Sequence, residues 1–226
     1  ELFKLSEFDK AESLYNTLLK SNYLNSDILN NLAFILSKKG NTDGVIKLLK
    51  DSLIIDSNNS QTLNNLGVAF NKLDDTKTAK NYLKKGIKIS PFFPDLYNNF
   101  GFSLIKEGKI KKAIEYFKKA IKLKPDYCGA YLNLANAYKE INHLKEAKRF
   151  VLKSLDINKN YKKAYVTLAK LNHDLNDLDG ALEIYKKILN FKNNEAEIFN
   201  DIGVIYGKKG ELENAILFFS EAIKID

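Results

Sequence analysis

The side chains best placed to do chemistry in this chain are amides, because asparagine returns at one fixed spacing. The positions are 34 residues apart: Asn31, Asn65, Asn99 and Asn133. Three of them directly follow another asparagine: Asn30, Asn64 and Asn98. A primary amide has a carbonyl acceptor and two N–H donors, so it can bond both the C=O and the N–H of a peptide group. The spacing predicts a row of side chains that holds an extended peptide by its backbone.

Other reactive side chains are few. The only histidines are His143 and His173, and the only cysteine is Cys128. The histidines lack the spacing of a two-histidine metal site, and the sequence has no glycine-rich phosphate loop. Cys128 has no histidine in register to activate it. We therefore predict no catalytic residue, no metal site and no cofactor, and we expect that the chain is not an enzyme.

The elements that must position the asparagines follow from the same period. Successive units begin at Ser26, Ser60, Pro94, Cys128, Lys162 and Ala196. Within a unit, a large apolar fourth place, a small eighth place and a mostly large eleventh place form one stripe of a first helix. A turn follows at Gly40, Asp74, Gly108, Asn142, Asn176 and Gly210. A second stripe then predicts a second helix, as in Ala113, Phe117 and Ala120. Because period-two alternation is absent, the predicted fold class is all-α.

These signature places resemble the tetratricopeptide repeat, most closely between Pro94 and Pro125. The resemblance covers nearly the whole chain and implies one right-handed superhelical solenoid over residues 1–226, of about six and a half helix-turn-helix units. The predicted units are 1–25 in part, 26–59, 60–93, 94–127, 128–161, 162–195 and 196–226 in part. Ala11 and Tyr15 fall in register in the leading half-unit. Departures from the pattern are expected to loosen the third and fifth junctions locally: Val45, Lys159, Asn172 and Asn193.

In this family, places two, five, six, nine and thirteen of the first helix line a concave groove. The ninth place carries large apolar residues in the first three whole units: Phe34, Val68 and Phe102. The thirteenth carries lysines in the same units: Lys38, Lys72 and Lys106. The last two whole units differ, at Leu132, Val166, Lys170 and His173. Amide, apolar and lysine rows side by side suit an extended, partly apolar and acidic segment.

The asparagine row resembles that of O-GlcNAc transferase arrays and other members that grip a peptide backbone. The family's clamp for chaperone C-terminal carboxylates is disfavoured. That clamp needs lysine and arginine at places two and six of its third unit, where this chain offers pairs such as Asp95 and Asn99.

The charge of the chain does not by itself indicate a nucleic-acid partner. The net charge is +8 and the pI about 9.2, but Arg149 is the only arginine, which argues against phosphate or base recognition. The lysines fall mostly on second helices and are predicted to be solvated. No apolar run is long enough to span a membrane. The single cysteine neither requires nor excludes an oxidising compartment, and a cytoplasmic location is the default expectation.

The sequence begins and ends inside repeats, so we expect a piece excised from a longer protein. The last helix exposes Ile216, Phe219, Ile223 and Ile225, which predicts end-to-end self-association.

The sequence thus favours a protein-interaction scaffold that binds an extended peptide or partner segment in its groove. One alternative is the substrate-recruiting arm of a larger enzyme, such as a glycosyltransferase. A less favoured alternative is nucleic-acid binding by the lysine-rich surface.

Overall fold

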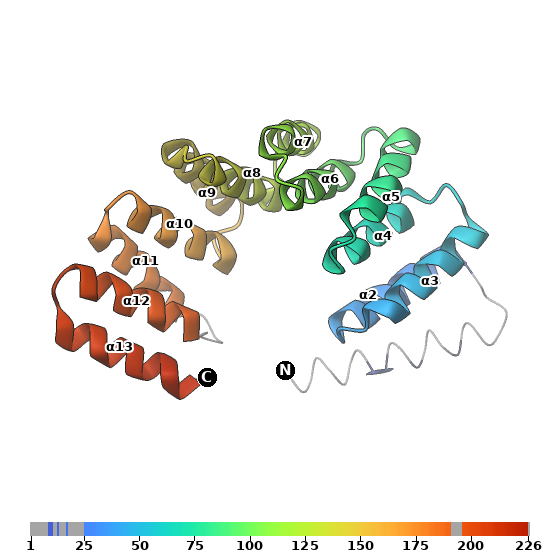
Figure 1. Cartoon of the computed structure of the whole chain (residues 1–226). Coiled ribbons are helices and arrows are strands. Elements are labelled where there is room, and N and C mark those ends of the chain that lie inside the picture. The colour runs from blue at the N-terminus through green and yellow to red at the C-terminus, as the bar shows by residue number, and fades with distance from the viewer. Residues whose placement is uncertain (1–8, 11–12, 14–16, 18–24, 191–195, 226) are drawn as a thin grey trace. The chain divides into compact units, whose positions relative to one another are not determined.

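The computed structural model describes residues 9–10, 13, 17, 25–190 and 196–225. Within that part of the chain, twelve helices were assigned and no strand (Figure 1). Ala11 and Tyr15, predicted to belong to the leading half-unit, lie outside it, as does Asn193.

Each whole unit folds as two helices joined by a short turn. The first helices are α2 (Ser26–Lys38), α4 (Ser60–Lys72), α6 (Pro94–Lys106), α8 (Cys128–Glu140), α10 (Lys162–Asp174) and α12 (Ala196–Lys208). The second helices are α3 (Thr42–Ile55), α5 (Thr76–Ile89), α7 (Ile110–Leu123), α9 (Leu144–Ile157), α11 (Leu178–Leu189) and α13 (Leu212–Ile225). Every first helix begins at the residue where the sequence places the start of a unit, so the predicted period and all-α class are confirmed.

The turn residues reverse the chain because they adopt left-handed backbone. Positive φ occurs at Gly40, Asp74, Gly108, Asn142, Asn176 and Gly210, with φ between 58° and 78°. Glycine, asparagine and aspartate are the residues that tolerate this region at a helix end. The predicted role of all six positions is confirmed, and each places a second helix back against the first.

The small residue at the eighth place lets the two helices of a unit approach closely. A Cβ added to Gly101 would lie 2.7 Å from the Phe117 ring, and one added to Gly203 would lie 2.7 Å from the Phe219 ring. Phe117 is fully buried. The aromatic side chain of the second helix thus packs directly on the backbone of the first.

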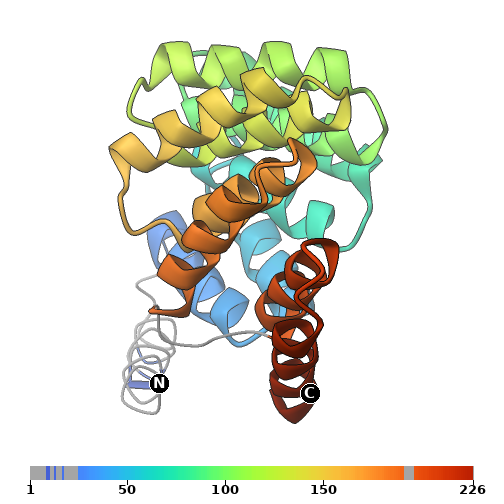
Figure 2. The ribbon, with the colours of Figure 1, turned by 90° about the vertical axis from the view of Figure 1, so that its left-hand side faces the viewer.

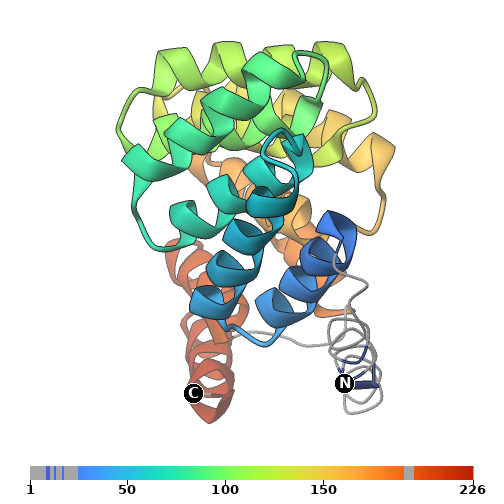
Figure 3. The same ribbon diagram turned by 90° about the vertical axis from the view of Figure 1, so that its right-hand side faces the viewer.

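The chain forms two compact units, residues 1–124 and residues 125–226. In the first unit, α2 and α3 run side by side, and the later helices pack in chain order, α3 on α4 and α5 on α6 (Figure 3). In the second unit, α9 packs on α10 and α11 on α12. Each unit has its own apolar core, such as the cluster around Leu49 and Leu66 and the cluster around Tyr185 and Ile198.

The last helix, α13, lies beside α12 (Figure 2) and keeps an apolar face in solvent. Ile216 and Ile223 are 66% and 78% exposed, whereas Ala215 is the helix's only buried residue. Phe219 is half-buried against Gly203, and Ile225 is exposed.

Among the described residues, no helix is long and apolar enough to cross a membrane.

Candidate functional site

The two asparagines of each doubled pair have different surroundings. The fifth-place residues Asn30, Asn64 and Asn98 are only 8%, 5% and 7% exposed. The expectation that they face an open groove is wrong, because they lie between neighbouring first helices. The sixth-place residues remain accessible: Asn31 is exposed, and Asn65, Asn99 and Asn133 are half-buried.

Consecutive units are joined by the same amide–amide bond. Asn65 Nδ2 donates to Asn30 Oδ1 at 3.0 Å, and Asn99 Nδ2 donates to Asn64 Oδ1 at 2.8 Å. The sixth-place amides also accept hydrogen bonds, Asn65 from Gln61 at 2.9 Å and Asn99 from Asn98 at 3.4 Å. Within the described part of the chain, Asn65 and Asn99 each keep one N–H and one carbonyl lone pair for another partner.

A buried polar cluster fixes Asn30 in its orientation. Asn30 Nδ2 donates to Ser26 O at 2.8 Å, to Ser52 Oγ at 3.1 Å and to Thr62 Oγ1 at 2.7 Å. Ser52 and Thr62 are both fully buried and hydrogen-bonded to each other at 2.9 Å. Because these bonds occupy its N–H groups, the Asn30 carbonyl is turned toward Asn65. The fifth-place asparagine therefore positions the sixth-place one.

The apolar ninth place is accessible beside this row. Phe34 and Phe102 are 55% and 40% exposed, and Val68 is half-buried. Lysines from one turn later lie over both rings, Lys38 at 5.1 Å from the Phe34 centroid and Lys106 at 5.6 Å from the Phe102 centroid. Exposed aromatic groups of this kind often mark a contact surface.

The three predicted lysines are not equivalent. Lys106 Nζ donates to the backbone carbonyl oxygen of Asn71 at 2.7 Å and forms an ion pair with Asp74. Lys38 and Lys72 are exposed, and neither pairs with a carboxylate within the described residues. The positive charge available to a ligand is therefore concentrated at α2 and α4.

An apolar pocket of about 240 Å³ opens between α2, α3 and α4. It brings together four of the predicted residues: Phe34, Asn65, Val68 and Lys72. Sequence reasoning missed its depth, which comes from the second helix: Val45 and Leu49 form part of the wall. Val45 was expected to loosen its junction, and it is buried at the edge of this pocket.

A second pocket of about 200 Å³ lies in the other compact unit and is polar. Its lining includes Lys139, Lys170, Asp174 and Asp201. Lys139 pairs with Asp174 at 3.1 Å, and Lys170 lies 3.7 Å from Asp201. Tyr185 OH donates to Asp201 at 2.8 Å, and burial together with that carboxylate raises the pKa of the Tyr185 phenol. The charges in this pocket are thus largely balanced by one another.

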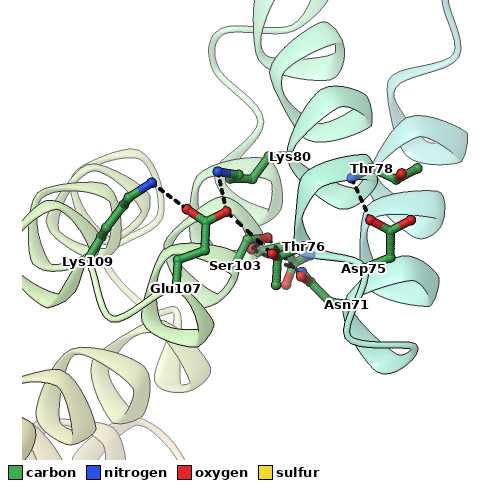
Figure 4. A network of polar contacts seen from close by, with 9 residues as sticks. Asn71, Asp75, Thr76, Thr78, Lys80, Ser103, Glu107 and Lys109 are labelled. Atoms are coloured by element: carbon green, nitrogen blue, oxygen red, sulfur yellow. Dashed lines mark hydrogen bonds and ion pairs between the residues drawn. The ribbon is translucent and has the colours of Figure 1, made fainter.

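Further contacts tie the helices of the first unit together (Figure 4). Glu107 lies between Lys109, 2.7 Å away, and Lys80, with which it forms an ion pair. Hydrogen bonds from Lys109 and Lys80 lower the pKa of the Glu107 carboxyl to about 2. Nearby, Ser103 Oγ donates to Asn71 Oδ1 at 3.0 Å. These contacts are structural, since they connect α5 to α6 and α7.

The remaining reactive side chains are two histidines and one cysteine, two of which, His173 and Cys128, lie on different first helices. His173 Nδ1 is 3.6 Å from Asp174, and its Nε2 is buried without a hydrogen-bond partner, as is Asn172 Oδ1. Cys128 is a half-buried free thiol at the first position of α8. Among the described residues, no group of three or more potential metal ligands comes together.

These features define a class: an all-α array of helical hairpins whose accessible face carries amides, aromatic groups and lysines. The tetratricopeptide repeat profile matches residues 60–93, 129–161, 162–195 and 196–226, and a second TPR repeat profile matches residues 101–142. The chain belongs to the tetratricopeptide repeat family. Proteins of this family are generally non-catalytic scaffolds for protein interactions.

Solved structures show the same fold at low sequence identity. The pilF protein of Pseudomonas aeruginosa is 19% identical, with a TM-score of 0.73 over 94% of this chain and 90% of its own. PilW, a type IV pilus biogenesis factor, is 19% identical, with a TM-score of 0.79 over 87% and 91%. The TPR protein TTC0263 of Thermus thermophilus is 18% identical, with a TM-score of 0.71 over 85% and 99%. No curated protein matches the chain significantly.

Proposed function

We propose that this chain binds an extended, partly apolar and acidic segment of a partner protein, and that it has no catalytic activity of its own. The observation that carries the proposal is the pair of positioned amides, Asn65 and Asn99. Each is held by a buried asparagine of the preceding unit and keeps one donor and one acceptor unused. Such an amide can pair with the C=O and N–H of one peptide group without reading its side chain.

The neighbouring rows add affinity and a charge preference. Phe34, Val68 and Phe102 offer apolar surface, and each large side chain buried on binding contributes about 1.5–3 kcal/mol. Lys38 and Lys72 attract acidic flanking residues. Each amide contact adds a net ~1 kcal/mol, whereas association costs at least ~4 kcal/mol. Affinity in the micromolar range or weaker is therefore expected for one short segment.

In the proposal, Asn31 extends the row within the first compact unit, and Asn133 is the equivalent peptide contact of the second unit. Asn31 is exposed and Asn133 half-buried, as a groove contact requires. Asn30, Asn64 and Asn98 act as positioning residues, and Lys106 contributes less because Asp74 already pairs with it.

The alternatives predict different results. A substrate-recruiting arm of a larger enzyme, such as a glycosyltransferase, would use the same amide row, and a catalytic domain elsewhere in the full-length protein would favour that reading. Nucleic-acid binding would use the lysines of the second helices, such as Lys84, Lys85 and Lys119, which are exposed. That binding would fall steeply as salt rises and would not depend on the asparagines.

The test is binding of a fluorescent acidic peptide library to the wild-type chain and to an Asn65→Ala, Asn99→Ala double variant. Library members selected by the wild type are expected to bind the variant at least about tenfold more weakly, by the loss of two amide contacts. A Lys84→Ala, Lys85→Ala variant is the matched control and should bind as the wild type does. Equal binding to the amide variant, or loss only in the lysine variant, would exclude the proposal.

A further inference from the structure

The apolar pocket and the polar pocket occupy the same place in two different repeats. The corresponding lining positions lie four repeats apart: Phe34 and Lys170, Ser37 and His173, Leu49 and Tyr185, Asn65 and Asp201, Val68 and Val204, and Ala69 and Ile205. In both cases two first helices and the second helix between them form walls of the pocket, and Lys139 of α8 also lines the second one. The array has therefore built one inter-repeat pocket twice, with opposite chemistry.

Two side chains at the wall of the first pocket are smaller than their counterparts between the next two first helices, α4 and α6. Ser37 and Ala69 stand where the next junction has Asn71 and Ser103, which fill that space by hydrogen-bonding to each other at 3.0 Å. Between α10 and α12 the same places carry His173 and Ile205, and a pocket of about 200 Å³ with a polar lining remains there. The first pocket thus differs from its counterpart in polarity, as an apolar recess lined by Phe34, Val45, Leu49 and Val68.

The volume of the recess limits what can enter it. The volume of about 240 Å³ is below the 300–1,000 Å³ of drug-sized sites. A recess of this size suits one large apolar side chain better than a drug-sized ligand.

The rim of the recess matches an acidic peptide. Asn65, an amide with a free donor and acceptor, lines the recess, as does Lys72, which has no carboxylate partner among the described residues. Lys38 lies over the Phe34 ring at the same wall. A peptide held by the Asn65 amide can therefore place a side chain in the recess and carboxylates beside the two lysines.

We infer that the first pocket is a side-chain-selective subsite that takes one leucine or phenylalanine side chain of an acidic, extended peptide. This inference rests on the proposed peptide-binding function and adds its specificity. The equivalent pocket in the second compact unit rejects the same side chain, because Lys170, Asp174 and Asp201 would lose hydration against an apolar group.

The probes are acetylated, amidated peptides Asp-Gly-Asp-X-Asp-Gly-Asp in which X is Leu, Phe, Ala or Lys. Calorimetry with the wild-type chain is expected to show Leu and Phe binding about tenfold or more tightly than Ala, from burial of the side chain. Ala69→Ile, which adds three carbon atoms at the wall of the recess, should reduce this preference and leave binding of the Ala peptide unchanged.

Two further variants keep the result interpretable if Ala69→Ile fails to fold. Ser37→Asn introduces the residue that fills the next junction, at a half-buried position, and should also reduce the preference. Val204→Ala changes the equivalent pocket and should preserve it. Equal affinity of Leu, Ala and Lys peptides for the wild type would overturn the subsite while leaving backbone binding intact.

N-acetyl-leucine amide separates the subsite from the peptide function. NMR shifts at Val68 and Ala69 with this small probe, without binding of any peptide, would support the recess and refute the proposed function. No shift with the probe and no preference for Leu would overturn the subsite.

Discussion

At the residue scale, the main finding is that two adjacent asparagines have separate tasks. A step of one residue turns a helical side chain by about 100°, which moves it from the seam between first helices to their accessible face. The 34-residue spacing predicted the row. It did not predict which member of each pair is buried, because that depends on partners from other helices, such as Ser52 and Thr62 around Asn30.

Substituting the buried Asn30 should lower the free energy of unfolding more than substituting its exposed neighbour Asn31. Asn30→Ala removes the hydrogen bonds that Asn30 makes with Ser26 O, Thr62 Oγ1 and the Asn65 amide, so we expect a loss of about 1–3 kcal/mol in the free energy of unfolding. Asn31→Ala is the matched control, with a change within about 0.5 kcal/mol. Urea unfolding followed by circular dichroism measures both. Similar losses for the two variants would contradict the assigned roles.

The Glu107 carboxyl should make stability depend on acid pH. Its pKa in the folded chain is about 2, against a usual 4.5, because of Lys109 and Lys80. The unfolded state therefore takes up the proton first, and the stabilisation is present above pH ~4.5 and lost as pH falls toward ~2. The difference in unfolding free energy between wild type and Glu107→Gln should shrink over that range. A difference that stays constant would show that the carboxyl is not held by these lysines.

At the element scale, the sequence predicted the helices well because each is specified by its own stripe and turn. The six turn residues and the starts of the first helices are where the repeat places them. The pockets were not predictable in the same way. Their linings combine side chains from consecutive repeats, such as Ser37 with Ala69, and no single repeat carries that information.

Substitution by alanine should have opposite effects on stability at two glycines of α12, Gly203 and Gly207. In Gly203→Ala the new Cβ would lie 2.7 Å from the Phe219 ring, so the helices must separate, at a cost of about 1–3 kcal/mol. In Gly207→Ala nothing lies within 4 Å of the new Cβ, and reduced backbone freedom in the unfolded chain should stabilise by about 0.4–1 kcal/mol. Thermal unfolding distinguishes them. Equal shifts of the midpoint in one direction would refute close packing at Gly203.

At the scale of the whole molecule, the same kind of contact joins one hairpin to the next within each compact unit. Within the first compact unit, a Cβ added to Gly86 of α5 would lie 2.7 Å from Leu96, which comes from the following first helix. The corresponding place on α13 is Ala222, which lines an open trough with Phe219 and Ile223.

Self-association should therefore depend on α13. Sedimentation of the wild-type chain near millimolar concentration is expected to show species larger than a monomer, because apolar face burial favours association. Ile216→Glu with Ile223→Glu should restore a monomer, since both side chains are exposed and the change costs little folding stability. A wild type that stays strictly monomeric at that concentration would refute this expectation.

The central claim is that the sixth-place amides hold a peptide by its backbone, and a double-mutant cycle tests it most directly. In the Asp-Gly-Asp-Leu-Asp-Gly-Asp peptide, each backbone N–H is replaced in turn by an ester oxygen. Affinities are then measured for the wild type and for Asn65→Ala. We expect one ester to weaken wild-type binding about fivefold, the worth of one hydrogen bond, and to have little effect in the variant. If every ester weakens binding equally in both proteins, Asn65 does not bond the peptide backbone and the account is wrong.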